Sequence, residues 1–588
     1  MLTGGSFLTT KIDKESVFCV ESFSEIQQEF GKAAFEFATN EIYPQRDKIE
    51  EFNEELSLQL MRRSGEIGLL GADVPEQYGG VAQDKVTSAL LVEKITNGGS
   101  ESFTVTFSAH TGIGTLPIVY FGTEEQKSKY LPKLASGEWL SAYALTEPNS
   151  GSDALSIRTS AKLSEDKKYY ILNGNKQFIS NGGWADILIT FAKIDGVKLT
   201  GFIIDPKSAG VIRNEEKNKL GLHGSSTCNV MLENVKVPVE NVLGAISGGA
   251  DIAFNSLNIG RFKLGAAVLG GCKNVIHESV DYALSRRQFG QSITKFDAIK
   301  RKFADMATRA YSLESIVYET AGLLDKSIAA VDTASTNYYQ EVANAIEKFA
   351  IECSICKVYG SEAHWQSADD GLQIFGGYGV IEDYPMARRI RDTRVDRIYE
   401  GTNEINRQII LGYIIKKTIL EELPIREKIR EITAAELGDI PSFGNDVLAA
   451  EKRSLEISKY LTLYVLNEAL IRYGQDLLNE QQVGELLSDM ISNIFVLQTS
   501  LARISQTIKS SGHARFLLAI GKVLAAEITM EMHMLARKAI NNLLQNDLLE
   551  RALQDVRKLE DEMYLRTDVI TLKKEIADFI YNEKKYPF

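Results

Sequence analysis

Two long stretches without proline constrain the fold of this 588-residue chain more than any other feature. No proline lies inside residues 239–384, and none inside residues 442–586. Proline breaks a helix interior because it lacks an amide donor and clashes with the preceding turn. In the second stretch apolar residues also recur at helical spacing, as at Ile494, Leu497 and Leu501. Both stretches are therefore predicted to be helical, the first mainly because it lacks proline.

Residues 141–243 follow a different pattern, with short segments rich in β-branched and aromatic residues separated by turn residues. The Asn173-Gly174 pair lies between two strand-like runs and predicts a hairpin turn. Residues 20–139 are again predicted to be helical, with turns at 73–75 and 79–80. The predicted fold class is mainly α with a central β domain. The predicted division is an N-terminal helical domain (1–140), a central β domain (141–243), a C-terminal helical bundle (244–425) and an extra C-terminal helical domain (426–588).

Composition excludes several classes of protein. An apolar share of 44% and a charged share of 25% are typical of a globular protein. A net charge of -13, without a basic run, argues against nucleic acid as a partner. The first residues have neither the pattern of a signal peptide nor that of a mitochondrial transit peptide, and five scattered cysteines suit a reducing compartment. We therefore expect a cytoplasmic protein.

Common cofactor and metal motifs are missing from the sequence. It contains neither GxGxxG after a strand nor GxxxxGK[ST], so a Rossmann or P-loop nucleotide site is not expected. Cys353 and Cys356 form a single CxxC, but the surrounding residues are predicted to be helical, and this spacing then puts both side chains on one core face. No metal site is predicted.

Two segments carry candidate chemistry. In IYEGTNEINR, residues 398–407, Glu400 lies between Tyr399 and Gly401, where partial burial would raise its pKa toward that of a useful base. The alternative is a solvated glutamate in a turn. In YALTEPNSGSD, residues 143–153, hydroxyl and backbone donors suit a flat polar ring or a phosphate. A plain surface loop would have the same composition.

Six motifs occur together in one order: YALTEPNSGSD, KQFISNGG, GLHGSSTCNVMLENVKVPVENVLG, SRRQFGQSI, QIFGGYG and IYEGTNEINR. With this set, residues 20–420 resemble the acyl-CoA dehydrogenase family, most of all its very-long-chain branch and the bacterial counterparts. The resemblance implies an N-terminal helical domain, a β-barrel-like middle domain and a C-terminal four-helix bundle. It also implies FAD as cofactor, a fatty acyl-CoA as substrate, trans-2-enoyl-CoA as product, and an electron-transfer flavoprotein as partner.

The resemblance assigns roles to individual residues. Glu400 becomes the base that removes the α proton, and Gly401 lets the thioester approach closely. In a minority of the family the base comes from the position of Gly260, where glycine has no side chain to serve. The cofactor-binding positions are Tyr143, Leu145, Thr146, Gly151, Ser152, Phe178, Ser180, Arg286, Gln288, Phe289, Gln373, Gly377, Thr402 and Glu404. The substrate-binding positions are Ser152, Asn258, Arg261, Tyr399 and Gly401.

Three of these assignments have further consequences. Phe178 and Ser180 match the pair that covers the far side of the flavin ring, where the family often has Trp and Thr. The set Arg286, Gln288, Phe289, Gln373 and Gly377 matches positions that reach the FAD of a neighbouring subunit, so a homodimer is expected. Small residues at Ser108, Ala109, Gly112 and Gly114 lie on the helix that narrows the pocket in medium-chain members, which predicts a deep cavity and long acyl chains.

The extension after residue 430 has no chemical motif. Its stretch RFLLAIGKVLAAEITMEMHMLARKA suits burial in a helical core, and the alternative is an amphipathic helix on a membrane surface. Two other functions stay open. An acyl-CoA oxidase would share the base and the flavin but pass electrons to oxygen. A non-catalytic relative, serving in assembly or binding, is opposed by the intact Glu400 and the acidic net charge.

Overall fold

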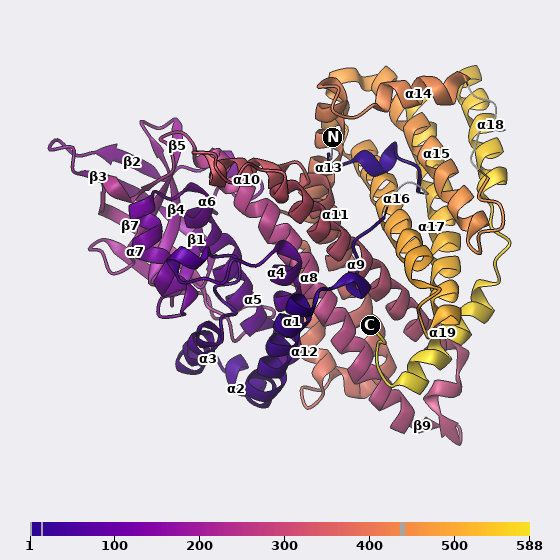
Figure 1. Cartoon of the computed structure of the whole chain (residues 1–588), viewed down its shortest axis with the longest axis horizontal. Coiled ribbons are helices and arrows are strands. Elements are labelled where there is room, and N and C mark those ends of the chain that lie inside the picture. The colour runs from indigo at the N-terminus through magenta and orange to yellow at the C-terminus, as the bar shows by residue number, and fades with distance from the viewer. Residues whose placement is uncertain (1–2, 13–15, 435–441) are drawn as a thin grey trace.

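A computed structural model of the chain describes residues 3–12, 16–434 and 442–588. Pro441, next to the second proline-free stretch, and the first two residues of the chain lie outside these ranges. Figure 1 shows the β-sheet at one end of the molecule, a helical bundle in the middle and the last helices at the other end. The predicted fold class, mainly α with a central β domain and extra C-terminal helices, is confirmed.

The chain begins with short helices, five of which start at a capping side chain. Ser24, Asn53, Asp84, Ser100 and Thr123 each accept a hydrogen bond from a backbone N–H of the first turn that follows. After its last residue, α5 continues directly into one π-helical turn, His110–Gly114. The helices are α1 (Glu25–Phe37), α2 (Arg46–Glu50), α3 (Glu54–Glu66), α4 (Lys85–Ile95), α5 (Glu101–Ala109), α6 (Leu116–Phe121) and α7 (Glu124–Ala135).

An eight-stranded sheet follows, with strand order β6-β7-β3-β2-β4-β5-β8 and β1 paired to β4. Its pairs are antiparallel except β1 with β4 and β2 with β4. The strands are β1 (Ser141–Ala144), β2 (Ser160–Leu163), β3 (Tyr169–Ser180), β4 (Ile187–Ile194), β5 (Lys198–Ile204), β6 (Val211–Glu215), β7 (Thr227–Pro238) and β8 (Val242–Leu243).

The predicted hairpin turn at Asn173-Gly174 is wrong, because both residues lie inside the continuous strand β3. The register with β7 shifts between Leu172 and Gly174, which marks a β-bulge. A Cβ atom at Gly174 would lie 2.2 Å from the Thr159 hydroxyl oxygen, so this glycine lets the strand pass close to the segment before β2. Gly174 therefore allows close packing within the sheet and does not reverse the chain.

The first proline-free stretch forms the long helices predicted for it. Cys353 and Cys356 are buried within α11, in agreement with a core helix. A two-stranded ribbon, β9 (Arg287–Gln288) with β10 (Gln291–Ser292), joins the first two helices. The helices are α8 (Gly249–Ser285), α9 (Asp297–Ala329), α10 (Tyr338–Glu347) and α11 (Ala350–Phe375), and α12 (Pro385–Thr393) and α13 (Asn403–Ile419) follow them.

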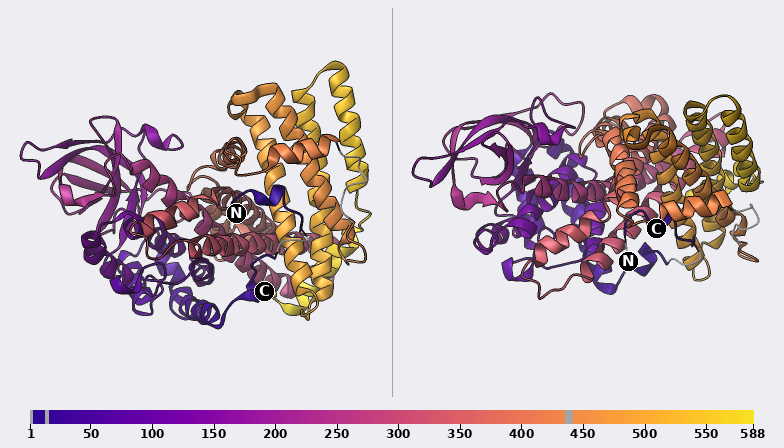
Figure 2. Two further views of the ribbon diagram at one scale, coloured as in Figure 1. Left: turned by 45° about the horizontal axis from the view of Figure 1, so that its top comes forward. Right: turned by 90° about the horizontal axis from the view of Figure 1, so that it is seen from above.

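The extension after residue 430 packs beside the bundle, as both views in Figure 2 show. Ile494, Leu497 and Leu501 are fully or nearly fully buried, as their spacing predicted. One face of α17 is buried too, which favours the core interpretation of that stretch over membrane contact. No described helix is long and apolar enough to cross a bilayer. The helices are α14 (Ile425–Ala434), α15 (Ala449–Tyr473), α16 (Gln481–Thr507), α17 (Ala514–Leu543), α18 (Asn546–Met563) and α19 (Val569–Glu583).

A buried ionic cluster joins the helices of different parts of the chain. Lys273 of α8 contacts Glu93 of α4 at 2.9 Å and also pairs with Glu314 of α9. On the other side of Glu314, Arg503 of α16 donates to its carboxylate at 2.7 Å, and the same guanidinium binds Glu21 at 2.8 Å. Arg503 and Glu314 are 1% and 0% exposed. Charges buried this deeply are stable only when paired, so the cluster fixes how these helices meet.

Arg503→Met tests this cluster. The substitution leaves Glu314 buried with one cation fewer, so we expect a loss of about 3 kcal/mol or more of unfolding free energy, seen as a lower Tm. Arg515→Met is the matched control, because Arg515 is exposed and its ion pair is with Glu575 on the surface, and its Tm should stay close to that of the wild type. Equal Tm values for the two variants would contradict a structural role for the cluster.

Candidate active site

Glu400 lies in the short connection between a 3-10 turn, Arg394–Arg397, and α13. Its backbone is left-handed, with φ 57°, and that of Gly401 has φ 81°. The amide of Asn406 donates to the carbonyl oxygens of Gly401 and Thr402 at 2.9 and 3.0 Å, and Arg261 donates to that of Glu400 at 3.3 Å. A left-handed glutamate is uncommon, and these bonds hold it in place.

The carboxyl group of Glu400 is buried against α8. Its Oε2 atom has no hydrogen-bond partner among the described residues. Gly260 of α8 lies directly opposite, and a Cβ atom there would be 2.4 Å from Oε2. Because glycine has no side chain, the carboxyl group fits against the helix. The solvated-turn alternative for Glu400 therefore does not hold.

Burial raises the pKa of Glu400 to about 7, while the charges of Arg261 and Lys357 act to lower it. Burial likewise lowers the pKa of Lys357 to about 7 against the attraction of Asp396 and Glu400. The Lys357 ammonium donates to Asn403 at 2.6 Å, in the first turn of α13. A carboxyl group that titrates near neutral pH is suited to general-base catalysis.

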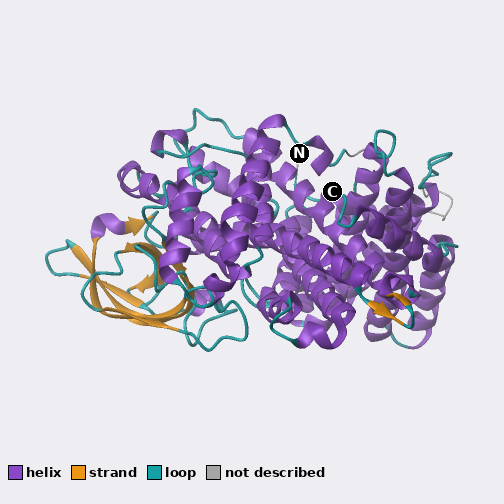
Figure 3. Cartoon of the chain, turned by 90° about the horizontal axis from the view of Figure 1, so that it is seen from below, coloured by secondary structure: helices purple, strands orange, loops and turns teal. Residues whose placement is uncertain are grey.

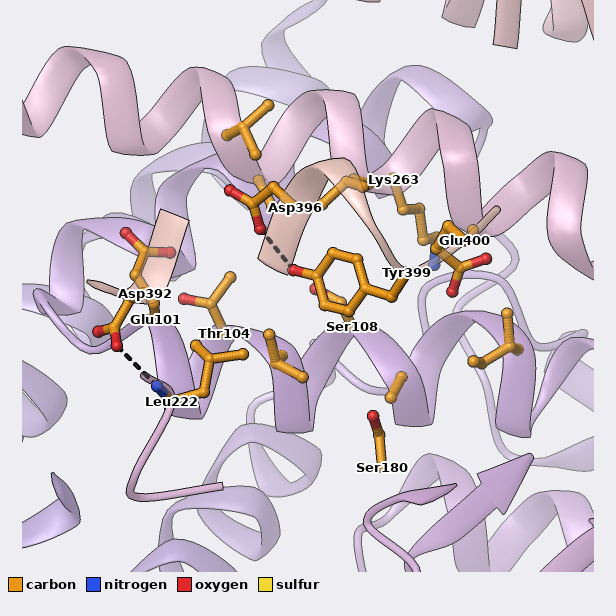
Figure 4. Close-up of a pocket in the computed structure, with 17 residues that line it drawn as sticks. Glu101, Thr104, Ser108, Ser180, Leu222, Lys263, Asp392, Asp396, Tyr399 and Glu400 are labelled. Atoms are coloured by element: carbon orange, nitrogen blue, oxygen red, sulfur yellow. Dashed lines mark hydrogen bonds between the residues drawn. The ribbon is translucent and has the colours of Figure 1, made fainter. Parts of the chain in front are cut away.

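A cavity extends from Glu400 between α5 and α8. Figure 4 shows Glu400 at one end, with Tyr399 and Ser108 between it and a group of carboxyl side chains at the other end. Tyr399 donates a hydrogen bond from its hydroxyl to Asp396 at 2.7 Å, which fixes its ring beside the cavity. Apolar side chains on the walls are Val105, Ala109, Ile113, Leu264, Ala267 and Val268.

The four small residues predicted to widen the cavity have different surroundings. Ser108 and Ala109 line it. A Cβ atom at Gly114 would lie 2.3 Å from the Ser141 hydroxyl oxygen, so this glycine faces strand β1. Gly112 faces the side chain of Lys263. Half of the predicted set therefore shapes the cavity directly.

The β domain contributes a second group of predicted residues. Tyr143 of β1 is buried and donates to the carbonyl of Ala253 at 3.4 Å, and Ser180 at the end of β3 lines the cavity. Phe178 has a left-handed backbone and is 58% exposed, so its ring is free to cover a flat ligand. Ser152 is exposed in the loop after β1. These residues come from strands and loops that face the helices.

A buried ion pair braces the loop after β1. Lys176 of β3 donates to Glu147 at 2.8 Å and to the carbonyl of Leu145 at 3.2 Å. Glu147 accepts further hydrogen bonds from the N–H groups of Arg158 and Thr159 at 2.6 and 3.0 Å. The loop is thereby held in one conformation, unlike a plain surface loop.

The remaining predicted residues divide between the Glu400 region and a distant groove. Thr402 caps α13 by accepting from the N–H of Ile405, and Glu404 lies exposed in its first turn. Asn258 accepts from Arg261 at 2.8 Å, and both are buried. The groove contains Arg286, Gln288, Phe289 and Gly377, and the exposed Gln373 lies near it on α11.

Comparison with known proteins agrees with this geometry. The acyl-CoA dehydrogenase N-terminal, middle and C-terminal domains match residues 24–138, 142–235 and 247–414, and a further acyl-CoA dehydrogenase C-terminal domain matches residues 457–558. A probable acyl-CoA dehydrogenase of Bacillus subtilis (strain 168) is 40% identical over 589 residues, covering 99% of this chain and 98% of that protein. This chain belongs to the acyl-CoA dehydrogenase family.

Two further relatives show the range of similarity. The mitochondrial very long-chain specific acyl-CoA dehydrogenase of Bos taurus is 37% identical over 490 residues, covering 78% of this chain and 71% of that protein. A crystal structure of an acyl-CoA dehydrogenase complexed with FAD from Bacillus anthracis has a TM-score of 0.96 and 41% identity, with both chains fully covered. This acyl-CoA dehydrogenase is accordingly an FAD-dependent oxidoreductase.

The residues present fit FAD. Gly151, Gly376 and Gly377 have open space where a Cβ atom would point, so a ligand is free to approach the backbone there. Exposed Phe178 offers an apolar face in the β domain, where the braced loop offers hydroxyl and N–H donors, and Phe289, which is 91% exposed, offers one in the distant groove. Thr146, Ser152 and Ser180 are the polar groups that would hold the cofactor on the side of the β domain, and Arg286 is the cation of the distant groove.

Sequence reasoning missed several supporting residues. Asn406 and Lys357 hold or tune Glu400, and the pair Glu147 and Lys176 braces the loop. Glu147, Lys176 and Asn406 lie inside the motifs that were recognised, so their polar character within those motifs was the available signal. Lys357 lies on a distant helix, and only the tertiary structure brings it near.

Gly260→Ala tests the packing of Glu400. The new methyl group would displace the carboxyl end of a flexible side chain, so we expect the fold and FAD content to be kept while kcat falls about tenfold or more. FAD absorbance and steady-state rates measure the two effects. Gly112→Ala is the control, since its Cβ would make only ordinary contact, 3.5 Å from Lys263. Wild-type kcat in Gly260→Ala would contradict this placement.

Proposed function

We propose that this enzyme oxidises long-chain fatty acyl-CoA thioesters to trans-2-enoyl-CoA, the first step of fatty acid β-oxidation, and passes the electrons to an electron-transfer flavoprotein. The observation that carries the proposal is the buried Oε2 atom of Glu400, which has no hydrogen-bond partner among the described residues and lies at one end of a mainly apolar cavity. Such a cavity suits an acyl chain, and such a carboxyl group suits removal of a weakly acidic proton.

Glu400 acts as the base in this proposal. As a carboxylate it takes the α proton of the thioester through its Oε2 atom, which no described residue binds. Gly401, without a side chain, leaves room for the thioester beside the base. Bound FAD supplies the acceptor for the hydride of the β carbon. Arg261 and Asn406 keep the Glu400 backbone fixed, so that the carboxylate does not have to be reoriented for each turnover.

Two features support long acyl chains as substrates. Ser108 and Ala109 leave the α5 side of the cavity open where larger side chains would fill it. The very long-chain specific enzyme of Bos taurus is also among the relatives. The electron-transfer flavoprotein is proposed as electron acceptor because the chain belongs to the acyl-CoA dehydrogenase family. The oxidase alternative differs in releasing peroxide in air, whereas a dehydrogenase reduces a dye under anaerobic conditions.

The distant groove supports a homodimer in which each FAD is completed by the second copy. The groove lies at the far end of α8 from the sheet, and Figure 3 shows β9 and β10 on the opposite side of the molecule from the other strands. One FAD bound near the sheet of its own chain therefore does not reach this groove. Exposed Phe289 and Arg286 would reach the cofactor of a partner instead.

Glu400→Gln is the direct test of the base. Glutamine keeps the shape of the side chain but has no carboxylate, so we expect FAD and acyl-CoA to bind while the flavin is no longer reduced, a loss of about a thousandfold or more in rate. Anaerobic mixing with hexadecanoyl-CoA, followed by flavin absorbance, measures this. Asp476→Asn, an exposed carboxyl group of the extra helices, is the control. Normal bleaching in Glu400→Gln would refute the assignment.

The pH dependence provides a second test. Only the carboxylate form of Glu400 accepts a proton, so kcat/KM should fall about tenfold per unit as pH drops below about 7. Lys357→Met removes a charge that lowers the pKa of Glu400, so the acid limb should move to higher pH. Lys452→Met, a buried lysine paired with Asp446 on the extra helices, should leave the limb in place. If the acid limb of kcat/KM stays at the same pH in Lys357→Met, the charge of Lys357 does not affect the pKa of Glu400.

A further inference from the structure

The end of the cavity opposite Glu400 is polar. Figure 4 shows Glu101 and Asp392 together at that end, with Asp396 nearby, and all three line the cavity. They come from α5, α12 and the turn before Glu400. A pocket built for the methyl end of an unsubstituted alkyl chain would be expected to end in apolar side chains, because a polar group without a partner there loses its hydration.

Two of the three carboxyl groups are used by the fold. Glu101 accepts from Arg389 at 2.9 Å. Asp396 accepts from Tyr399 at 2.7 Å with one oxygen and lies 3.0 Å from the Nδ1 atom of His364 with the other. These contacts account for the two side chains without any ligand.

Asp392 differs from its neighbours. Its residue is 3% exposed, and its Oδ1 atom accepts from the N–H of Leu222 at 2.6 Å. Its Oδ2 atom is buried and has no hydrogen-bond partner among the described residues. Burial, helped by the charge of Glu50, raises the pKa of Asp392 to about 8. The group is therefore mostly protonated at neutral pH and has an O–H to donate, and leaving it unpaired is unfavourable.

The path to Asp392 suits an alkyl segment. Ser108 and Glu101 lie seven residues apart on α5, about 10 Å along the helix axis. Between them the walls include Val105, Leu264 and Val268. A chain that enters at Glu400 would pass this apolar stretch before reaching the unpaired oxygen.

We propose that Asp392 forms a subsite for a hydroxyl group at the distal end of the acyl chain, which makes ω-hydroxyacyl-CoA thioesters preferred substrates. The inference rests on the proposed function, because it concerns the same cavity. A hydroxyl group both accepts and donates, so it satisfies Asp392 without bringing in a charge. A terminal carboxylate would be desolvated beside Glu101 and Asp396, so the ω-carboxy chain is the disfavoured member of a matched series.

The test compares substrates of equal length on the purified holoenzyme. The series runs from octanoyl-CoA to octadecanoyl-CoA, each as the unsubstituted, ω-hydroxy and ω-carboxy form, with kcat/KM measured by anaerobic dye reduction. At the length that reaches Asp392, the ω-hydroxy form should exceed the unsubstituted form about tenfold. The ω-carboxy form should be the poorest at that length.

Two variants link the preference to Asp392. In Asp392→Asn the amide oxygen still accepts from the N–H of Leu222, and the amide NH2 is a donor in place of Oδ2. The tenfold ratio of kcat/KM between the ω-hydroxy and unsubstituted forms should therefore remain. Asp392→Ala has neither group, and its ratio should fall to about one. Because the ratio is taken within one protein, a general loss of activity cancels, and if Asp392→Ala does not fold, the wild-type series decides alone.

The outcomes separate this inference from the proposed function. Turnover of the unsubstituted long chains with a ratio near one at every length overturns the subsite and leaves the proposed function standing. An unchanged preference in Asp392→Ala overturns the assignment to Asp392. Failure of every thioester in the series, hydroxylated or not, to reduce the enzyme overturns both proposals.

Discussion

The buried ion pairs around Glu314 are the interaction on which the arrangement of this enzyme depends. Lys273 on one side and Arg503 on the other neutralise a carboxylate that has no access to water. In a low-dielectric interior each charge needs its partner at close range, so α8, α9 and α16 have little freedom to shift. The same α8 carries Gly260 and Arg261, and through them the cluster fixes the surface on which Glu400 rests.

In the active site, burial raises the pKa of a carboxyl group that has no close ion pair. Within the cluster every charge is paired, whereas the Oε2 atom of Glu400 has no hydrogen-bond partner in the part of the chain that the structure describes. The absence of a direct ion pair is what keeps its pKa near neutrality, since the more distant Arg261 and Lys357 offset burial only in part. A carboxylate paired as closely as Glu314 would be too weak a base. Backbone contacts from Asn406 supply the rigidity that a salt bridge would otherwise provide.

Local patterns were reliable where one force dominated and ambiguous where two competed. Helical spacing at Ile494, Leu497 and Leu501 predicted buried faces correctly, because burial alone sets that period. Asn173-Gly174 failed as a turn, since the same glycine that permits a reversal also permits the close approach of Thr159 to a strand. Gly114 likewise faces a strand and not the cavity, which a list of small residues does not reveal.

The sequence by itself determined the order of helical and β segments, the family, and the residue most suited to act as base, because these follow from periodicity and from contiguous motifs. The tertiary structure decided what surrounds that base. Gly260 and Lys357 are far from Glu400 along the chain, and their effect on it depends on distance and on the exclusion of water. Desolvation arises only when distant segments pack together, so no local pattern encodes it.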